Sequence, residues 1–80
     1  MLDLRPNCEC CDRELAPDSL DARICSYACT FCAACAEERL GGTCPNCFGE
    51  LVRRPVRPVA KLLIDPASTR RVRKPHAACA

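Results

Sequence analysis

The sequence predicts a small metal-stabilised α+β domain, and three observations support that fold class. The chain has 80 residues and only three aromatic side chains, so apolar burial alone gives it little stability. Short segments of strand and helix formers lie between its turn-forming residues. Eight of its ten cysteines stand in four closely spaced pairs, Cys8/Cys11, Cys25/Cys29, Cys32/Cys35 and Cys44/Cys47. We therefore expect short hairpin strands and one short helix held together by metal.

The spacing of these pairs is that of zinc-binding turns. Three pairs are separated by two residues and one pair by three, so two sulfurs of one tight turn can reach the same tetrahedral ion. Because zinc takes four ligands, two turns must meet at each ion. The eight paired thiols thus predict two Zn²⁺ ions per chain, and we favour metal over disulfides.

Three cysteines compete for two ligand positions in the first turn. Cys8 and Cys11 have the spacing of the later pairs, so we assign these two and expect Cys10 to point away. Cys10 and Cys79 are then spare thiols, which we expect to be packed or partly exposed at Cys10 and part of a disordered tail at Cys79. Metal transfer, redox sensing or a disulfide between chains is the alternative interpretation of both.

The elements between the pairs follow from local composition. Residues 12–24 form a polar connection that ends in a short strand anchored by Ile24. Phe31, between the second and third pairs, is predicted to lie in the core. Residues 36–40 are good helix formers followed by two glycines, which predicts a helix of about two turns. Residues 51–52 continue from the last pair as a strand.

Composition changes after the last strand, and we divide the chain there. Residues 1–52 are predicted to be the zinc-binding domain, and residues 53–80 a basic C-terminal extension. Pro55 and Pro58 favour an extended backbone, because proline interrupts a helix and restricts the residue before it.

A short helix is predicted within residues 58–64, with a proline at its first position. We expect its apolar face to pack back on the zinc core near Leu40 and Leu51; docking of a second chain is the alternative. Residues 67–80 are expected to fray.

Charge divides at nearly the same point. Residues 1–50 carry nine acidic side chains against four arginines, a net charge of −5, whereas residues 51–80 carry eight basic side chains against one acid, a net charge of +7. We expect the two halves to attract each other. A nucleic acid could also contact the basic run Arg70, Arg71, Arg73 and Lys74 through its phosphates. Because no aromatic residues interleave with these bases, such binding would be non-specific.

The complete spacing, C-x2-C-x13-C-x3-C-x2-C-x2-C-x8-C-x2-C, resembles that of the RING finger over about half of the chain. Phe31 before the fifth cysteine and Pro45 after the seventh occupy places typical of RING fingers. The resemblance implies a cross-brace with interleaved ligands: Cys8, Cys11, Cys32 and Cys35 at one zinc, and Cys25, Cys29, Cys44 and Cys47 at the other. Two successive zinc ribbons would instead join the first pair to the second and the third to the fourth.

Ubiquitin-ligase-like activity is the function that a RING resemblance would imply. RING ligases present an aliphatic residue between their first two ligands, often an aromatic before the seventh, and commonly an arginine after the last. This chain has Cys10, Thr43 and Phe48 at those places. These departures argue against recruitment of a ubiquitin-conjugating enzyme.

Over its whole length, the chain resembles a family of small bacterial cysteine-rich proteins that is catalogued as a domain of unknown function. Residues 4–11, 29–32, 44–47 and 50–55 carry this resemblance. It implies a zinc-bound fold and a bacterial source, and it supplies no activity.

The function that we expect is that of a non-catalytic adaptor. Four cysteines per ion leave no position for a reactive water, and the single histidine, His76, lies in the predicted tail. We therefore expect no catalytic residues, no small-molecule substrate and a protein partner. The sequence shows neither a secretory segment nor an apolar run long enough for a membrane span, so a cytoplasmic location and no membrane partner are expected.

Overall fold

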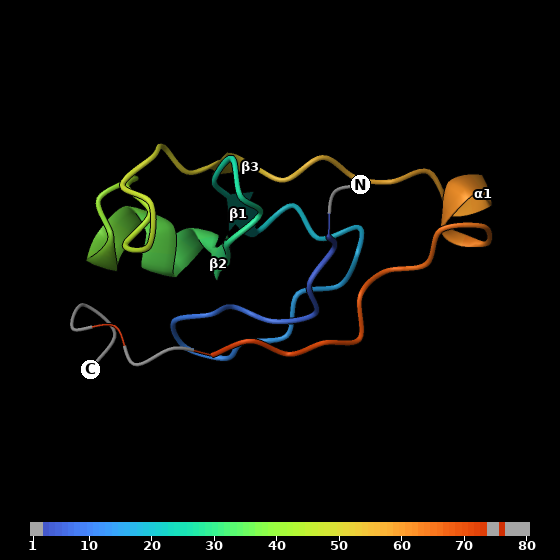
Figure 1. The fold of residues 1–80 in the computed structure, drawn as a ribbon, viewed down its shortest axis with the longest axis horizontal. Coiled ribbons are helices and arrows are strands. Elements are labelled where there is room, and N and C mark those ends of the chain that lie inside the picture. The colour runs from blue at the N-terminus through green and yellow to red at the C-terminus, as the bar shows by residue number, and fades with distance from the viewer. Residues whose placement is uncertain (1–2, 74–75, 77–80) are drawn as a thin grey trace.

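A small antiparallel sheet forms the centre of the cysteine-rich part (Figure 1). This computed structural model describes residues 3–73 and 76. The elements follow the order β1 (Ala22–Ile24), β2 (Thr30–Cys32), η1 (Cys35–Arg39), β3 (Val52–Arg53) and α1 (Val59–Leu62). The sheet has the order β2-β1-β3, and both neighbouring pairs are antiparallel. The predicted small α+β fold is confirmed.

The core lies between the sheet and the cysteine-bearing turns, and it consists mainly of sulfur. Phe31 in β2 is fully buried, as predicted, and Ile24 in β1 is nearly so. Within the described residues, seven of the eleven members of the core cluster are cysteines. Thiols bury less apolar surface than leucine or phenylalanine, so this interior offers little hydrophobic stabilisation. A further source of stability is required, as the composition predicts.

The first and last cysteine pairs lie on turns of the same geometry. We call residues 7–14 the first knuckle and residues 43–50 the second knuckle; an isolated antiparallel bridge closes each. In both, the amide of the leading cysteine donates to the carbonyl five residues on, and the amide four residues on donates back to the carbonyl of that cysteine. The residue four positions on has a left-handed backbone, with φ of 65° at Asp12 and 62° at Phe48.

Both helical segments are short. The helix expected after the third pair is present as the single π-type turn η1, in which the amide of Leu40 donates to the carbonyl of Cys35. Gly41 and Gly42 end it with positive φ of 60° and 79°, a conformation that glycine adopts without steric cost. No helix among the described residues combines the length and apolar character required to cross a bilayer.

Helix α1 lies at the opposite end of the molecule from η1 (Figure 1). It occupies part of the range 58–64, and it has no buried residues. Val59 and Leu63 are 76% and 84% exposed, so the expected packing of this helix near Leu40 and Leu51 is wrong. The physical reason is that two prolines hold residues 55–58 extended and carry the helix away from the core.

The chain after α1 returns along the N-terminal segment, and we call residues 68–73 together with His76 the C-terminal strap. The Asn7 side chain donates to the carbonyl of Val72 at 2.9 Å and accepts from its amide at 3.3 Å. The amide of Ser68 donates to the carbonyl of Leu4. The expectation that residues 67–80 fray is therefore wrong for the strap, because these contacts tie the backbone of Ser68 and Val72 to the N-terminal segment.

Opposite charges also hold the strap in place. The Arg71 guanidinium forms ion pairs with Asp12 and Glu14 of the first knuckle. This confirms that the basic and acidic halves attract each other. Lys74, predicted to contact nucleic acid, and Cys79, predicted to be a spare thiol, lie outside the described residues.

Candidate metal centre

Four thiols from two distant turns meet beside the sheet. Cys8 and Cys11 come from the first knuckle, Cys32 ends β2 and Cys35 begins η1. Their sulfurs all lie within 4.8 Å of one another, and we call these four residues the first cysteine cluster.

The first cysteine cluster has the spacing of a tetrahedral thiolate site. The sulfurs of Cys11 and Cys32 are 3.7 Å apart. Zinc–sulfur bonds of about 2.3 Å place the corners of a tetrahedron about 3.8 Å apart, whereas disulfide sulfurs are about 2.0 Å apart. All eight paired cysteines are free thiols. The donor set and its spacing therefore fit a divalent metal ion.

The second knuckle takes part in a smaller group. The sulfurs of Cys25, Cys44 and Cys47 lie within 4.8 Å of one another, and we call these three residues the second cysteine cluster. Cys29 lies beside this group and outside the set of mutually close sulfurs. Burial raises the pKa of Cys29, the neighbouring Asn46 side chain opposes that rise, and the neighbouring Cys25 thiol adds to it. Three of the four residues predicted for this site are thus gathered, and the fourth is adjacent.

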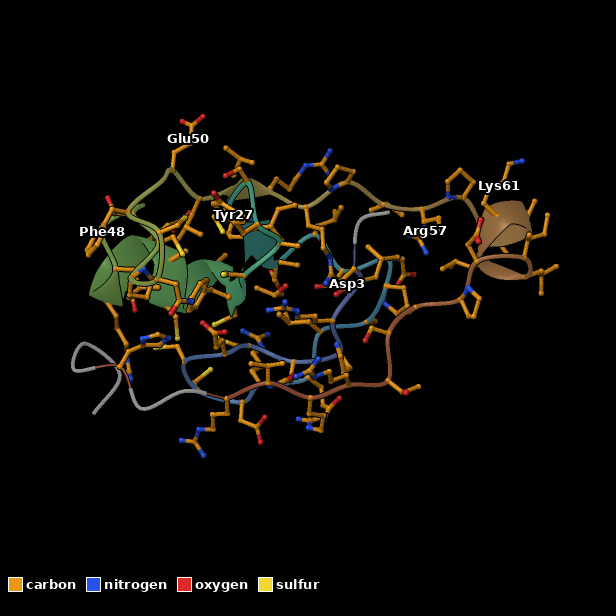
Figure 2. All side chains as sticks on the ribbon, in the orientation of Figure 1. Asp3, Tyr27, Phe48, Glu50, Arg57 and Lys61 are labelled. Atoms are coloured by element: carbon orange, nitrogen blue, oxygen red, sulfur yellow. The ribbon has the colours of Figure 1, made fainter. Side chains whose placement is uncertain are left out.

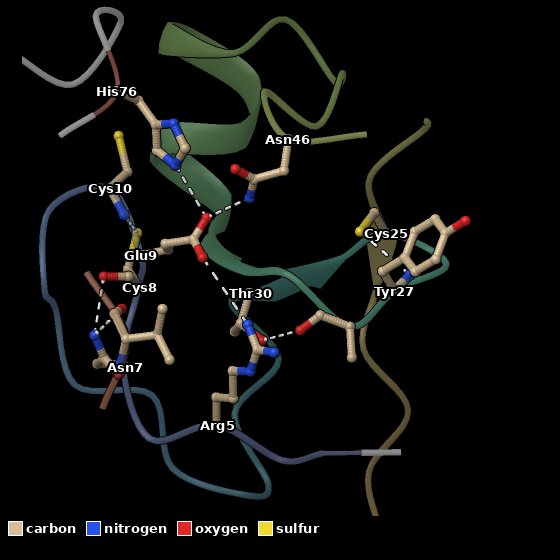
Figure 3. Close-up of polar contacts among 12 residues, drawn as sticks. Arg5, Asn7, Cys8, Glu9, Cys10, Cys25, Tyr27, Thr30, Asn46 and His76 are labelled. Atoms are coloured by element: carbon tan, nitrogen blue, oxygen red, sulfur yellow. Dashed lines mark hydrogen bonds and ion pairs between the residues drawn. The ribbon is translucent and has the colours of Figure 1, made fainter. Parts of the chain in front are cut away.

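The grouping of the thiols follows the interleaved order. The first pair meets the third, and the second pair meets the fourth. Successive zinc ribbons would require Cys25 to approach Cys8 and Cys11, which it does not do within these groups. Cys10 is buried and belongs to neither cluster, and its side chain points away from the Cys8 sulfur (Figure 3). Its sulfur forms a disulfide, so the expectation of a spare thiol at Cys10 is wrong.

Backbone amides point at the sulfurs in both clusters. The amide of Cys10 donates to Cys8 Sγ and the amide of Tyr27 donates to Cys25 Sγ, both at 3.4 Å (Figure 3). The amide of Cys11 also donates to Cys8 Sγ, at 3.5 Å. Burial alone would raise the pKa of Cys25. The amides of Tyr27 and Cys29, together with neighbouring thiols, outweigh the effect of burial and lower this pKa to about 7. Such donors favour thiolates and orient metal ligands.

Crowding of the thiols has the opposite effect elsewhere. Burial, reinforced by neighbouring thiols, raises the pKa of Cys35 well above its usual range, and burial raises that of Cys44 to about 12. Several thiolates this close repel one another unless a cation lies between them. A bound divalent ion would remove that obstacle, because it stabilises every surrounding thiolate.

A buried carboxylate that the sequence pattern did not predict lies between the two knuckles. Glu9 Oε2 accepts from Asn46 Nδ2 at 2.7 Å and lies 3.0 Å from His76 Nε2; Arg5 Nη1 lies 3.9 Å from Oε1 (Figure 3). The Glu9 side chain is only 2% exposed. Its sequence position gave no signal, because a glutamate between knuckle cysteines is ordinary, and His76 was assigned to a frayed tail.

Arg54 was likewise assigned to the basic extension, yet its side chain is completely buried. Its two terminal nitrogens each donate, at 2.9 Å, to the carbonyls of Arg5 and Ala16. Burial lowers the pKa of Arg54, but a guanidinium remains charged in proteins. This side chain therefore fastens the segment before the first knuckle to the end of β3.

The residues predicted to contact nucleic acid are not equivalent in the structure. Arg70 and Arg73 are exposed, whereas Arg71 engages two carboxylates of the first knuckle. Lys74 is not described. The structure thus leaves a weaker cationic surface than the sequence suggests.

Two of the three aromatic rings project from the turns of the second cysteine cluster. Tyr27 lies between Cys25 and Cys29 and is 75% exposed, and Phe48 directly follows Cys47 and is 80% exposed (Figure 2). Large exposed rings are uncommon on the surface of a small protein and are enriched at protein interfaces.

Comparison with known proteins places the chain among bacterial relatives. Residues 1–57 match the model of a family described as "protein of unknown function (DUF1272)". An uncharacterized protein of Rhizobium meliloti is 72% identical over 76 residues, which cover 95% of this chain and 90% of that protein. No solved structure matches the chain. The resemblance to a bacterial cysteine-rich family of unknown function is confirmed.

Proposed function

This chain belongs to the DUF1272 family, and we propose that it is a non-catalytic zinc-binding module whose surface mediates a macromolecular interaction. The first cysteine cluster is the observation that carries this proposal, because four free thiols from two turns lie at tetrahedral spacing. Soft thiolates in that arrangement favour zinc over magnesium or calcium.

Each cluster would hold one Zn²⁺ in a RING-like, interleaved arrangement. Cys8, Cys11, Cys32 and Cys35 would hold the first ion, and Cys29 would join the second cysteine cluster as its fourth ligand. Four thiolates leave zinc no open position, so both ions would be structural. Structural zinc contributes about 10–16 kcal/mol of apparent binding free energy in small fingers, which this sulfur-rich core needs.

The rings of Tyr27 and Phe48 support an interaction role. Both stand on turns that the second ion would stiffen, so their positions would be fixed before a partner arrives. Preorganised aromatic side chains lose little entropy on binding and commonly dominate binding energy. We propose a protein partner for this surface. We also propose a cytoplasmic location, because thiols there stay reduced and available to metal.

Native mass spectrometry tests the metal part of the proposal. The protein, purified without added chelator under reducing conditions, should carry two zinc ions, and denaturation should release both. Replacement of Cys32 by serine should leave one ion, whereas replacement of the exposed Ser26 by alanine should leave two. A wild-type protein without metal that keeps dispersed amide signals in its NMR spectrum would contradict the proposal.

A paired pull-down from a lysate of the source bacterium tests the interaction part. Wild-type protein is compared with a Tyr27→Ser/Phe48→Ser variant and with a Leu63→Ser control, which removes an exposed apolar side chain from the opposite end. We expect a protein retained by wild type and the control and lost from the aromatic variant, with two zinc ions present in all three. Retention by all three would refute a role for the rings.

A further inference from the structure

A buried hydrogen bond connects the two knuckles. Glu9 lies between Cys8 and Cys11, and Asn46 lies between Cys44 and Cys47. The bond from Asn46 Nδ2 to Glu9 Oε2 is 2.7 Å long, so it links the two metal-binding turns directly (Figure 3).

The same two residues also touch the remaining cysteine pairs. The Asn46 side chain lies next to the Cys29 thiol, and the Glu9 amide donates to the carbonyl of Thr30 at 2.9 Å. Thr30 begins β2, which ends at Cys32. We call Glu9 and Asn46 together the junction. The junction therefore contacts a residue in or near each of the four cysteine pairs.

We propose that Glu9 and Asn46 couple the two metal sites, so that an ion in either cluster raises the affinity of the other. This inference rests on the proposed zinc binding. An ion in the first cysteine cluster orders the first knuckle and holds the Glu9 carboxylate in place. That carboxylate then orients Asn46, which orders the second knuckle and Cys29 before the second ion arrives.

Burial is what gives the junction its strength. A carboxylate that is 2% exposed must keep its hydrogen-bond donors, because a buried charge without them is strongly disfavoured. His76 and Arg5 hold the carboxylate from the other sides, at 3.0 and 3.9 Å. Disorder in one knuckle therefore removes a donor or acceptor that the other knuckle requires. The first ion to bind orders both knuckles, so the second ion binds to a site that has already lost its conformational entropy.

Zinc titration followed by native mass spectrometry measures this coupling. Metal-free protein, kept reduced, receives one equivalent of Zn²⁺. Two independent sites, equal or unequal, put about half or more of the protein in the one-zinc form, whereas positive coupling suppresses that form. We expect wild type to consist mainly of metal-free and two-zinc protein. Asn46→Ala should restore the one-zinc form.

Matched variants separate the junction from a general loss of charge. Glu9→Gln keeps an oxygen that Asn46 can bond to and should retain part of the suppression, whereas Asn46→Asp opposes two carboxylates and should abolish it. Asp18→Asn removes an exposed carboxylate near α1 and should behave as wild type.

A thermodynamic cycle provides a second readout. Cys47→Ser disables the second site, and competition with a chromophoric chelator then gives the affinity of the first. We expect that affinity to fall about tenfold or more when Cys47 is replaced in wild type, and to stay unchanged when it is replaced in Asn46→Ala.

The zinc titration distinguishes a failure of zinc binding from a failure of the coupling between the two sites. A wild-type protein that takes up no zinc refutes the proposed function. A wild-type protein that takes up two zinc ions through an abundant one-zinc form refutes the coupling alone. So does suppression of the one-zinc form that persists unchanged in Asn46→Ala.

Discussion

The two knuckles have the same backbone and very different surroundings. The first knuckle is covered by the C-terminal strap, and its thiols belong to a group of four. The second knuckle carries the exposed ring of Phe48, and its thiols belong to a group of three. The comparison teaches that cysteine spacing specifies the turn, whereas the packed environment decides how completely the thiols gather and what else the turn presents.

The residue with a left-handed backbone differs between the two knuckles. The left-handed residue of the first knuckle is Asp12, which tolerates this conformation and bonds to Asn7 and Arg71. In the second knuckle it is Phe48, whose bulky side chain is disfavoured there. The second knuckle thus accepts backbone strain while displaying an aromatic ring, which fits the proposed binding surface.

Loss of single thiols should give the largest difference between the clusters. Cys35→Ser opens the first cysteine cluster, so we expect one zinc ion to be lost and most dispersed amide signals with it, because structural zinc contributes about 10–16 kcal/mol. Cys29→Ser should keep two ions, with the second bound more weakly, since the other three thiols of that site remain together and can hold zinc with a water in the fourth position. Metal counting and chelator competition measure both. Equal losses would show that the clusters are equivalent.

Arg54→Met should destabilise the zinc-loaded protein by about 2–4 kcal/mol. Its replacement leaves the carbonyls of half-buried Arg5 and exposed Ala16 without the donors that Arg54 supplies, and a carbonyl that loses its donor inside the protein costs about 1–3 kcal/mol. Denaturant unfolding measures the change, with Arg53→Met at the exposed neighbouring position as the control. Because Arg5 leads into the first knuckle, zinc release should accelerate there. Acceleration at the second cysteine cluster instead would contradict this asymmetry.

Phe48→Asn should stabilise the protein by about 1 kcal/mol, since asparagine adopts the left-handed conformation more readily than phenylalanine. Thermal unfolding with zinc bound measures the gain. Tyr27→Asn removes an equally exposed ring from a residue that does not have positive φ, and it should give no such gain. A loss of stability at Phe48 would mean that its ring packs on the second cysteine cluster, making the two knuckles more alike than they appear.

Arg71→Ala should have the smallest effect, because exposed ion pairs are weak and screened by salt. The strap should cover the first knuckle less tightly, and zinc should leave the first cysteine cluster slightly faster at low ionic strength only. Chelator-driven release at two salt concentrations tests this, with Arg70→Ala as the control. An effect that persists in high salt would show that Arg71 acts by packing.

The sequence by itself determined the local chemistry of this protein. A turn with two cysteines closes through hydrogen bonds that reach only four or five residues, so cysteine spacing was sufficient to predict the knuckles. The position of Phe31 between two pairs predicted its burial, and the helix formers and glycines after Cys35 predicted the short helix there. The resemblance to a known ligand order went further and indicated which pairs would meet.

Only the tertiary structure decided the fate of the charged side chains. Glu9 and Asn46 are 37 residues apart in sequence, Arg54 and Arg5 are 49 apart, and Glu9 and His76 are 67 apart. Composition places such residues at the surface, because burial of a charge is unfavourable until specific partners surround it. Those partners come together only when the chain is folded, which is why the junction between the knuckles could not be predicted from local pattern.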